Sequence, residues 1–541
     1  MNNRTDTRKG ETFYKSGKKP LFMYLQQHAE ERPMDTAYIY YGSSLTWGEL
    51  LEKVQSLAGY LVQNGFEKGD RIGLFMQNSP QYIIAHYAIQ YIGAIVCPLN
   101  PMYKANELDY LLNEVDMKGV FAGGELLPEA RKVSERLQQI IVVRYDNFIP
   151  EDSTWNVPED LQIATLELNK NEKHWSEIMK NAEPLTEPEE VDLEDTALLA
   201  FTSGTTGRPK AAMLTYKNAL YKTAAAVETN GVTDKETWLS VMPLCHIAGM
   251  VMGVNIPAYT GSPCVLFARF DPPEILRALN EYDVSVWYSI APMNEALLSI
   301  AEGTRLDHLR LNLCTSFGMP VTEKLAERWR EIAPQCVLFE ASYGLSETHT
   351  VDTYMPQDNI KFGSVGLPIT ETFIEIRDPA TGEPQLTEDP GEIVIQSPGV
   401  FKGYWNRPEA TSETLYNGWL HTGDIGYYDD DGYLYFQGRI KEMIKSSGFS
   451  IFPEDVEALL KEHAAVSQAA VIGIPDESRG EVVKAFIILK EDYSLNESEL
   501  KEWAKENMAR YKVPVQVEFR ESLPQTGAGK ILRRVLKDQE R

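Results

Sequence analysis

The 541-residue sequence is poor in cysteine and in basic charge, and it contains no long apolar run. Its five cysteines lie far apart and form no Cys-x-x-Cys pair, which disfavours a disulfide framework and a cysteine-based metal site. The 52 Lys and Arg residues stand against 79 Asp and Glu residues, a formal net charge of −27. A chain this acidic lacks the positive field that nucleic-acid coats and polybasic membrane binders need. We therefore expect no nucleic-acid partner.

Two further absences concern membranes and secretion. The longest apolar stretch, residues 82–99, is interrupted by polar residues and predicts a helix followed by a buried strand, not a membrane span. Residues 1–19 are polar and basic and lack the apolar segment of a secretory signal. We therefore expect a cytoplasmic protein without an integral membrane segment.

Alternating strands and helices fill the first part of the chain. Apolar residues make up 43% and charged residues 24%, as in globular proteins, and the length calls for more than one domain. Short apolar, largely β-branched runs alternate with helical segments such as 80–92; they lie at 71–76, 94–98, 118–122, 140–143 and 196–201. This alternation predicts βαβ units in covered, mostly parallel sheets.

The pattern changes after about residue 360. Short alternating strands at 373–377, 392–396 and 432–436 are separated by Gly, Pro and Asp turns and predict a small antiparallel barrel or sheet. Beyond Arg439 the chain has the pattern of a separate α+β module. The expected fold class is thus a large α/β domain of mixed or parallel sheets with a small β-barrel subdomain, followed by a small α+β domain.

A segment rich in hydroxyls and glycine follows the strand predicted at 196–201. It reads Thr-Ser-Gly-Thr-Thr-Gly-Arg-Pro-Lys over residues 202–210. Backbone N–H groups and hydroxyls of such a loop can surround phosphate oxygens, and Lys210 adds a cation. A Walker A loop is excluded because Gly207 is followed by Arg-Pro instead of Lys and a hydroxyl residue. An ordinary surface turn is the simpler alternative.

Five more motifs follow in a fixed order. They lie at Pro243–Gly249, Tyr343–Glu347, Gly418–Asp424, Gly438–Glu442 and Pro524–Lys530. With the 202–210 loop, nearly the whole chain resembles the adenylate-forming enzymes, which include acyl-CoA synthetases, peptide-synthetase adenylation domains and firefly luciferase. The resemblance implies that ATP and a carboxylic acid give acyl-AMP and pyrophosphate, and that CoA then takes the acyl group. A phosphopantetheine carrier protein in place of CoA is an open alternative.

The resemblance also implies which residues bind the nucleotide. They are Thr202, Ser203, Gly204, Thr205, Thr206, Gly207, Lys210, Gly318, Met319, Pro320, Tyr343, Gly344, Ser346, Asp424 and Arg439. Tyr343 is expected to stack on adenine and Asp424 to accept the ribose hydroxyls. Glu347 is expected to hold Mg²⁺, which favours one carboxylate with phosphate oxygens and water. Lys530 would offset charge between the substrate carboxylate and the α-phosphate. A turn-forming Asp and a solvated Lys are the simpler interpretations.

The resemblance places the acid near His246. The three expected catalytic residues are His246, Lys530 and Glu347. The expected acyl pocket contains His246, Gly249, Met250, Val254 and Phe317, although helix core explains this stretch equally well. Phe317 replaces a glycine usual in the family and would shorten or bend the pocket. The pocket candidates are largely apolar, so a medium- or long-chain fatty acid is expected, with an aryl acid as the alternative. Cys245 has an apolar setting and is expected to be an inert thiol.

A domain movement between the two half-reactions is implied as well. Lys441 matches the family's hinge position, while Lys445 and Gly448 match positions near the CoA thiol or, more simply, form a solvated turn. The expected divisions are 1–438 for the large domain (subdomains 1–190, 191–350 and 351–438), 439–441 for the hinge and 442–541 for the mobile domain. The oligomeric state is left open, a homodimer included. A non-catalytic homologue is disfavoured because Lys530 and Glu347 are both present.

Overall fold

A computed structural model of the chain describes residues 14–162, 167–202, 209–315, 321–446, 449–476, 479–525 and 531–540, without the side chains of Phe449 and Ser450. The described residues form two compact units, and each is considered by itself. The first unit comprises the described parts of 1–316, 321–373 and 396–418, and the second comprises those of 374–395 and 419–541.

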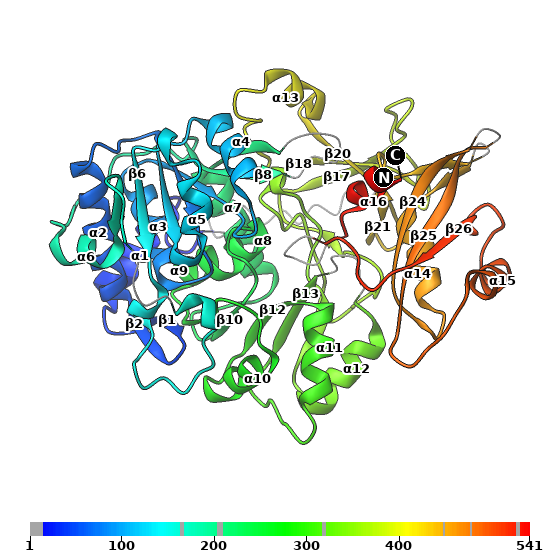
Figure 1. Ribbon diagram of the computed structural model, residues 1–541, viewed down its shortest axis with the longest axis horizontal. Helices are drawn as coiled ribbons and strands as arrows, with labels where there is room; N and C mark the ends of the chain where they lie inside the picture. Colours follow the sequence, from blue (N-terminus) through cyan, green and yellow to red (C-terminus); the bar gives the residue numbers. More distant parts are fainter. Residues whose placement is uncertain are drawn as a thin grey trace. The chain divides into compact units, whose positions relative to one another are not determined.

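The first unit contains a seven-stranded sheet, and the 202–210 loop joins two of its strands (Figure 1). Its strand order is β7-β6-β5-β3-β4-β8-β9. The bounds are β3 Arg71–Phe75, β4 Ile95–Pro98, β5 Gly119–Gly123, β6 Gln139–Val143, β7 Glu172–His174, β8 Thr196–Thr202 and β9 Lys210–Thr215. All pairs are parallel except β8 with β9. The strands are mostly apolar because helices cover such sheets.

Helices of this region follow local capping rules. They include α2 (Trp47–Gln63), α3 (Pro80–Tyr91), α4 (Ala105–Val115), α5 (Leu127–Arg131) and α6 (Trp175–Asn181). Ser79 caps α3 by accepting from the Tyr82 N–H, and Pro80 occupies the first turn, where no N–H is needed. Every residue of α3 is buried, so this helix belongs wholly to the core.

A second seven-stranded sheet has the order β14-β13-β12-β10-β11-β1-β2. The bounds are β1 Thr36–Tyr40, β2 Ser43–Thr46, β10 Trp238–Ser240, β11 Cys264–Leu266, β12 Val286–Ile290, β13 Leu311–Thr315 and β14 Val337–Glu340. Again every pair is parallel except the last, β1 with β2. Its neighbours in sequence are α10 (Pro272–Glu281), α11 (Ala291–Ile300) and α12 (Glu323–Ile332). Each large sheet therefore ends in one antiparallel pair, a likeness that the sequence does not reveal.

The second unit contains two further sheets. Antiparallel strands β17 (Phe373–Arg377), β18 (Gly391–Gln396), β20 (Trp419–Tyr428) and β21 (Leu434–Arg439) form the sheet predicted there. The other has β22 (Ile444–Ser446), β23 (Phe449–Ile451), β24 (Val466–Asp476), β25 (Gly480–Leu489) and β26 (Gln516–Phe519).

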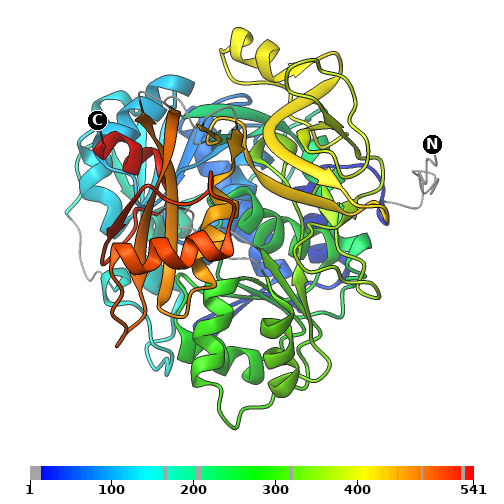
Figure 2. The same cartoon turned by 90° about the vertical axis from the view of Figure 1, so that its right-hand side faces the viewer.

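Alternate residues of β24 and β25 pack against different helices. Val471 and Ala485 belong to a core with residues of α14 (Pro453–Lys461) and α15 (Glu497–Asn507), whereas Ile472 and Phe486 pack with a residue of α16 (Arg533–Gln539). Figure 2 shows α15 lying across the strands. Because neighbouring strand residues point to opposite faces, helices cover both faces of this sheet.

The predicted fold class is confirmed, with mixed sheets, helices and a C-terminal α+β region. The compact units group 374–395 and 419–439 with the C-terminal region, whereas the sequence analysis ended the large domain at residue 438. That functional division and its hinge stay predictions. Among the described residues, no helix is long and apolar enough to cross a membrane.

Candidate active site

The 202–210 loop begins and ends at the edge of a sheet. Thr202 ends β8 and Lys210 begins β9, and the two residues are paired in register, with Thr202 Oγ1 3.4 Å from the Lys210 carbonyl oxygen. The Pro209 carbonyl accepts the Tyr110 hydroxyl at 3.0 Å. Both ends of the loop are thus held by strand pairing. Ser203, Gly204, Thr205, Thr206 and Gly207 lie outside the described residues.

Lys210 and Glu347 are connected through an aromatic residue that the sequence analysis missed. The Lys210 ammonium lies 4.4 Å from the centre of the Tyr404 ring, and the Tyr404 hydroxyl donates to Glu347 Oε1 at 2.7 Å. Tyr404 is 6% exposed, and burial together with the Glu347 charge raises the pKa of its hydroxyl. The phenol therefore stays protonated and can act as a fixed hydrogen-bond donor to the carboxylate.

The segment that carries Tyr404 is held by backbone contacts along β9. The Met213 N–H donates to the Gly403 carbonyl, and the Trp405 N–H donates to Ala211. Just before it, the Phe401 N–H donates to the Glu347 carbonyl at 2.8 Å. Three segments far apart in sequence are thereby joined at one place. The only signal in the sequence was a cluster of three aromatic residues, Phe401, Tyr404 and Trp405, interrupted by Lys402 and Gly403.

Tyr343 and Gly344 follow β14. The Tyr343 side chain is largely buried, and its N–H donates to Thr353 Oγ1 at 2.8 Å. A Cβ on Gly344 would lie 2.7 Å from backbone atoms of Thr350 and Val351. Glycine is therefore required here by the chain itself, which provides a reason independent of any nucleotide.

Left-handed backbone follows the short 3-10 turn of Ser346–Thr348. His349, Thr350 and Val351 have φ angles of 58°, 55° and 50°. Non-glycine residues rarely adopt this conformation, which costs about 1–3 kcal/mol for each residue, and β-branched residues tolerate it least. Strain of this size must be offset by the surrounding contacts, and it lies immediately after the expected metal ligand Glu347.

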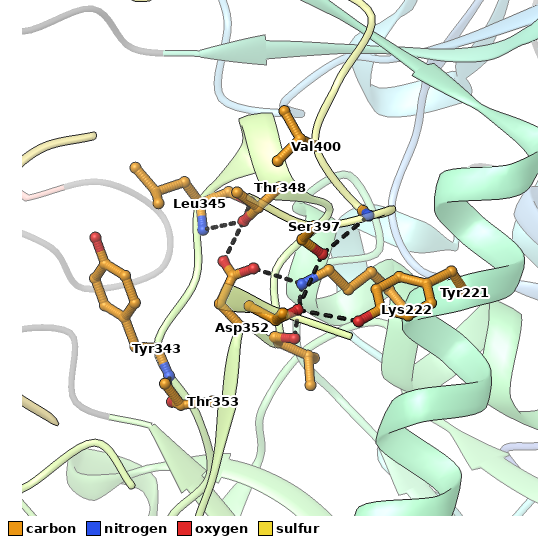
Figure 3. Close-up of polar contacts among 12 residues, drawn as sticks. Tyr221, Lys222, Tyr343, Leu345, Thr348, Asp352, Thr353, Ser397 and Val400 are labelled. Carbon is orange, nitrogen blue, oxygen red and sulfur yellow. Dashed lines mark hydrogen bonds and ion pairs between the residues drawn. The ribbon is translucent and has the colours of Figure 1, made fainter. Parts of the chain in front are cut away.

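A buried ion pair provides such contacts (Figure 3). Lys222, from helix α7 (Tyr216–Thr229), lies 2.5 Å from Asp352 Oδ1, and both side chains are 0% exposed. The Lys222 ammonium also donates to the Val351 carbonyl at 2.8 Å, and the Thr348 hydroxyl donates to Asp352 Oδ2. Val351 and the residues on either side of the left-handed stretch, Thr348 and Asp352, are thus held in place. A lysine inside the apolar, Ala-rich α7 was the signal in the sequence that went unused.

Glycine at position 399 makes room for the lysine. A Cβ there would lie 2.0 Å from Lys222 Cε, so a larger residue would displace the cation. Burial lowers the pKa of Lys222 and raises the pKa of Asp352. The charge of each group opposes the effect of burial on the pKa of the other group. The charged pair persists because each ion is hydrogen-bonded to its counter-ion.

His246 lies just before helix α8 (Ile247–Met250). Its Nε2 atom is buried and has no hydrogen-bond partner among the described residues, and burial lowers the pKa of the ring. The ring is therefore neutral at pH 7 and has a nitrogen available for a ligand. This state suits the expected contact with the acid.

The expected acyl-pocket residues lie on an interrupted helix. Gly249 and Met250 belong to α8, and Val254 belongs to a π-helical turn, Val251–Asn255, before α9 (Ile256–Thr260). Pro257 lacks an N–H, so the Gly253 carbonyl accepts the Tyr38 hydroxyl instead, at 3.1 Å.

These pocket candidates are buried, and Gly249 has a packing role. Met250 is 1% and Val254 0% exposed. A Cβ on Gly249 would lie 2.2 Å from the Pro243 carbonyl oxygen, so only glycine fits. Their contact with an acyl chain stays a prediction. Phe317, the fifth candidate, lies outside the described residues.

Asp424 and Arg439 form a pair within the second unit. They are opposite each other on β20 and β21, and Arg439 Nε lies 3.1 Å from Asp424 Oδ1. The alternative of a turn-forming Asp is wrong for Asp424, because it lies inside a ten-residue strand, after Gly423 with φ 71°. The local irregularity comes from this glycine. The structure thus brings together two of the residues that were expected to bind the nucleotide.

Lys441, the expected hinge residue, and Lys445, one of the expected CoA residues, are exposed. Lys441 lies in a turn, where the Glu442 and Met443 N–H groups donate to the Arg439 carbonyl. Lys445 lies within β22 and its N–H donates to Glu481, so the alternative of a solvated turn is wrong for this residue. Gly448, Gly318, Met319, Pro320 and Lys530 lie outside the described residues, so their roles stay predictions.

The cysteines and the metal expectation can be checked chemically. All five cysteines are free, and burial raises the pKa of Cys245 to about 12, so this thiol is inert at neutral pH. Among the described residues no group of three or more His, Cys, Asp or Glu side chains could hold a metal. Glu347 is half-buried and its Oε2 accepts no hydrogen bond from them. One available carboxylate oxygen fits Mg²⁺ that arrives with nucleotide phosphates.

The fold and these residues define a class: an adenylate-forming, AMP-producing acid–thiol ligase. The AMP-binding enzyme family matches residues 25–405, and the AMP-binding enzyme C-terminal domain matches residues 455–530. The chain belongs to the AMP-binding enzyme family. The resemblance inferred from the six motifs is thereby confirmed.

Known proteins similar to this chain match it over almost its full length. Long-chain-fatty-acid–CoA ligase of Bacillus subtilis (strain 168) is 34% identical over 533 residues, 96% of this chain and 95% of that ligase. Feruloyl-CoA synthase of Amycolatopsis sp is 32% identical over 94% of this chain and 96% of its own. The structure of O-succinylbenzoate coenzyme A synthetase from Bacillus subtilis, in complex with ATP and magnesium ion, matches with a TM-score of 0.83 at 28% identity, over 96% of this chain and 100% of that one.

Proposed function

We propose that the protein is an ATP-dependent acid–CoA ligase that activates a medium- or long-chain fatty acid to acyl-AMP and then transfers the acyl group to CoA. The observation that carries this proposal is the 34% identity with a long-chain-fatty-acid–CoA ligase over 96% of the chain. Met250 and Val254 are apolar and buried, which supports an apolar acid.

In the proposed first step, a carboxylate oxygen of the acid attacks the α-phosphorus of ATP and pyrophosphate leaves. Lys530 offsets the charge between the two anions, which favours the transition state electrostatically. The neutral His246, with its available Nε2, orients the acid. Asp424 and Arg439 hold the ribose. Mg²⁺, when bound at Glu347, neutralises charge on the leaving phosphates.

Tyr404 and Lys210 support the same step. The Tyr404 hydroxyl fixes one oxygen of Glu347 and leaves the other free for the metal. Lys210, held over the Tyr404 ring, places a cation at the base of the 202–210 loop. This preorganisation lowers the reorganisation needed when charge shifts to the leaving group.

In the proposed second step, residues 442–541 rotate about Lys441 relative to residues 1–438 and the thiol of CoA attacks the mixed anhydride. Exposed Lys441 can absorb the change in backbone angles, and exposed Lys445 can contact CoA together with Gly448. AMP leaves as the thioester forms. The thiol belongs to the cosubstrate, so no protein nucleophile is needed.

An aryl acid is the second candidate substrate. Its support is the 32% identity with a feruloyl-CoA synthase over 94% of the chain. Phe317, in place of a glycine usual in the family, would shorten a pocket for long chains. The distinction rests on the shape of the pocket, because the chemistry of both acids is the same.

We also propose a cytoplasmic location. Five free cysteines, one of them only partly buried, suit a reducing compartment. Cell fractionation with a probe for free thiols tests this proposal, and recovery of the protein with oxidised cysteines in a secreted fraction would contradict it.

The function is tested by measuring acid-dependent pyrophosphate release over saturated acids of increasing length and over aryl acids, with and without CoA. We expect release with fatty acids and thioester formation only when CoA is present. A preference for aryl acids would favour the second candidate. No acid-dependent release with any acid would contradict the proposed function.

Lys530→Ala tests the role of the expected catalytic lysine. Adenylation should fall by about 10²–10³-fold, because a fixed charge that acts in the transition state is lost. Thioester formation from supplied acyl-AMP should remain, since that step does not join two anions. Equal loss in both half-reactions would contradict the assigned role. Arg534→Met serves as the control, because it removes an exposed arginine that is paired with Asp538.

A further inference from the structure

Arg533 is the centre of a charged cluster in the second unit, and nothing above gives it a role. Its guanidinium forms two hydrogen bonds with Glu457, from Nε at 3.0 Å and from Nη2 at 2.8 Å. Nη1 contacts Glu454 Oε1 at 2.6 Å and also Glu442 Oε2. The Arg533 side chain is 10% exposed, so it is largely withdrawn from water.

The partners of Arg533 come from two places in the chain. Glu454 and Glu457 lie in the first turns of α14, while Glu442 follows Lys441, the expected hinge residue. Glu454 is also close to the strand before the hinge: a Cβ on Gly438 would lie 2.5 Å from Glu454 Oε2. Arg533 and its partners thus touch the chain on both sides of residues 439–441.

Arg533 also follows closely after the loop that contains Lys530. The described ends of that loop are joined, since Gln525 and Ile531 form an antiparallel bridge and the Leu532 N–H donates to the Pro524 carbonyl at 2.8 Å. Arg533 comes next in the chain, at the start of α16. Only Leu532 separates it from the bridge residue Ile531, so a shift of Arg533 is passed to the base of the loop.

The composition of the cluster is unusual for a purely stabilising contact. One guanidinium faces three carboxylates, and Glu454 Oε2 is buried with no hydrogen-bond partner among the described residues. A buried group of charges is a weak source of stability, because desolvation opposes the attraction. Apolar residues in place of all four charged groups would fill the same space without this desolvation cost, so the geometry of the contacts, more than stability, explains an arginine here.

We propose that Arg533 is a positioning residue: through Glu442 and α14 it fixes the base of the Lys530 loop to the segment that follows the hinge. The proposal rests on the adenylation function proposed above, in which Lys530 acts in the first half-reaction. The cluster makes the hinge segment, α14 and the base of the loop move as one body. The base of the loop therefore keeps its place relative to the hinge when this region rotates.

Arg533→Met tests the proposal, because methionine fills the space and removes the charge. We expect the kcat of adenylation to fall about 10–100-fold, since a displacement of about 1 Å in a catalytic group has effects of this size. The KM values for ATP and acid should change less than the kcat. The rate of thioester formation from supplied acyl-AMP should stay within about threefold of the rate of the unmodified protein, a change of less than a factor of ten.

Two further variants separate positioning from folding. Arg533→Lys keeps the cation and should recover most of the adenylation rate, although a point charge replaces the two-pronged contact with Glu457. Arg534→Met is the matched control, because the Arg534–Asp538 pair beside it has side chains 60% and 52% exposed. This variant should have the rate of the unmodified protein.

The outcomes distinguish this inference from the function on which it rests. If the unmodified protein releases no pyrophosphate with any acid, the proposed function fails. If it is active and Arg533→Met matches Arg534→Met, the positioning role is overturned. Equal loss of both half-reactions in a variant with an unchanged melting temperature would also overturn it. Loss of adenylation alone, with recovery in Arg533→Lys, supports it.

Discussion

Two charged clusters, one in each unit, are built on different principles. In the first unit, Lys222 and Asp352 are a single cation and a single anion, 2.5 Å apart and both 0% exposed. In the second, one Arg533 meets three carboxylates, and Glu454 among them is 26% exposed. The first cluster is balanced and sealed, whereas the second keeps an excess of negative charge.

The difference follows from what each cluster holds. Lys222 and Asp352 secure a left-handed stretch, 349–351, whose strain would otherwise be released by a local change of backbone. A balanced pair with no water has one stable arrangement, which suits a fixed support. The Arg533 cluster joins segments on both sides of an expected hinge, and Glu442 and Glu454 in it are only partly buried. Burial and charge balance thus distinguish a sealed support from a partly exposed one.

The largest expected effect comes from breaking the balanced pair. Lys222→Met leaves Asp352 buried without its cation, and we expect the free energy of unfolding of the first unit to fall by about 3–5 kcal/mol. Urea denaturation followed by the fluorescence of the buried tryptophans measures this loss. Adenylation should fall as well, because the strained stretch next to Glu347 loses its support.

The matched variant is Lys222→Met with Asp352→Leu, which removes both charges. It should regain much of the lost stability, because no unpaired charge remains in the core. Arg533→Met should cost less stability than Lys222→Met, since Glu442 and Glu454 are 19% and 26% exposed and keep contact with water. If Arg533→Met were the more destabilising of the two, the comparison between a sealed and a partly exposed cluster would fail.

A smaller effect is expected at Glu347, which the fixed support adjoins. Tyr404→Phe removes the hydroxyl that donates to Glu347 Oε1 but keeps the ring under Lys210. The concentration of Mg²⁺ that gives half-maximal adenylation should rise about 10-fold, as when a partner of a metal ligand is lost. Pyrophosphate release against Mg²⁺ concentration measures it, with exposed Tyr416→Phe as the control. An unchanged Mg²⁺ dependence would show that Tyr404 does not orient the carboxylate.

Much of the fold was predictable because its signals are local. Strand β3 and helix α3 were predicted to within one residue, since periodicity and turn residues define them. The return strand β9 was missed: the sequence analysis treated Lys210 as the end of a loop. An antiparallel pairing across a loop depends on contacts that no short window contains.

The site was predictable only where motifs mark it. Motif order identified Glu347, Asp424 and Arg439, but not the residues that hold them. Tyr404 reaches Glu347 over 57 positions of sequence, and Lys222 reaches Asp352 over 130. Such contacts follow from the tertiary arrangement. A single sequence signals such a contact at most by a residue that is unusual in its surroundings, such as a lysine in an Ala-rich helix.

The last prediction uses pH to separate the two units and begins with the second. Burial raises the pKa of Glu454 to about 7, in spite of the Arg533 cation and with help from the charges of Glu457 and Glu442. Lys461, also nearby, contributes a cation beside Glu457. Between the ordinary carboxyl pKa of 4.5 and about 7, the folded state holds more protons than the unfolded state. The stability of this unit should therefore fall as pH rises through that window.

The first unit should respond in the opposite direction. Burial, with a contribution from the Lys222 cation, lowers the pKa of His349 to about 3, so below its ordinary value of 6.5 the unfolded state holds more protons and stability falls as pH falls. Melting temperatures from pH 5 to 8 should show that Glu454→Gln removes the loss toward neutral pH. His349→Asn, which tolerates the left-handed backbone, should instead reduce the loss toward acid. If the melting temperatures of the two variants changed with pH in the same way, the two clusters would not differ as their charge balance implies.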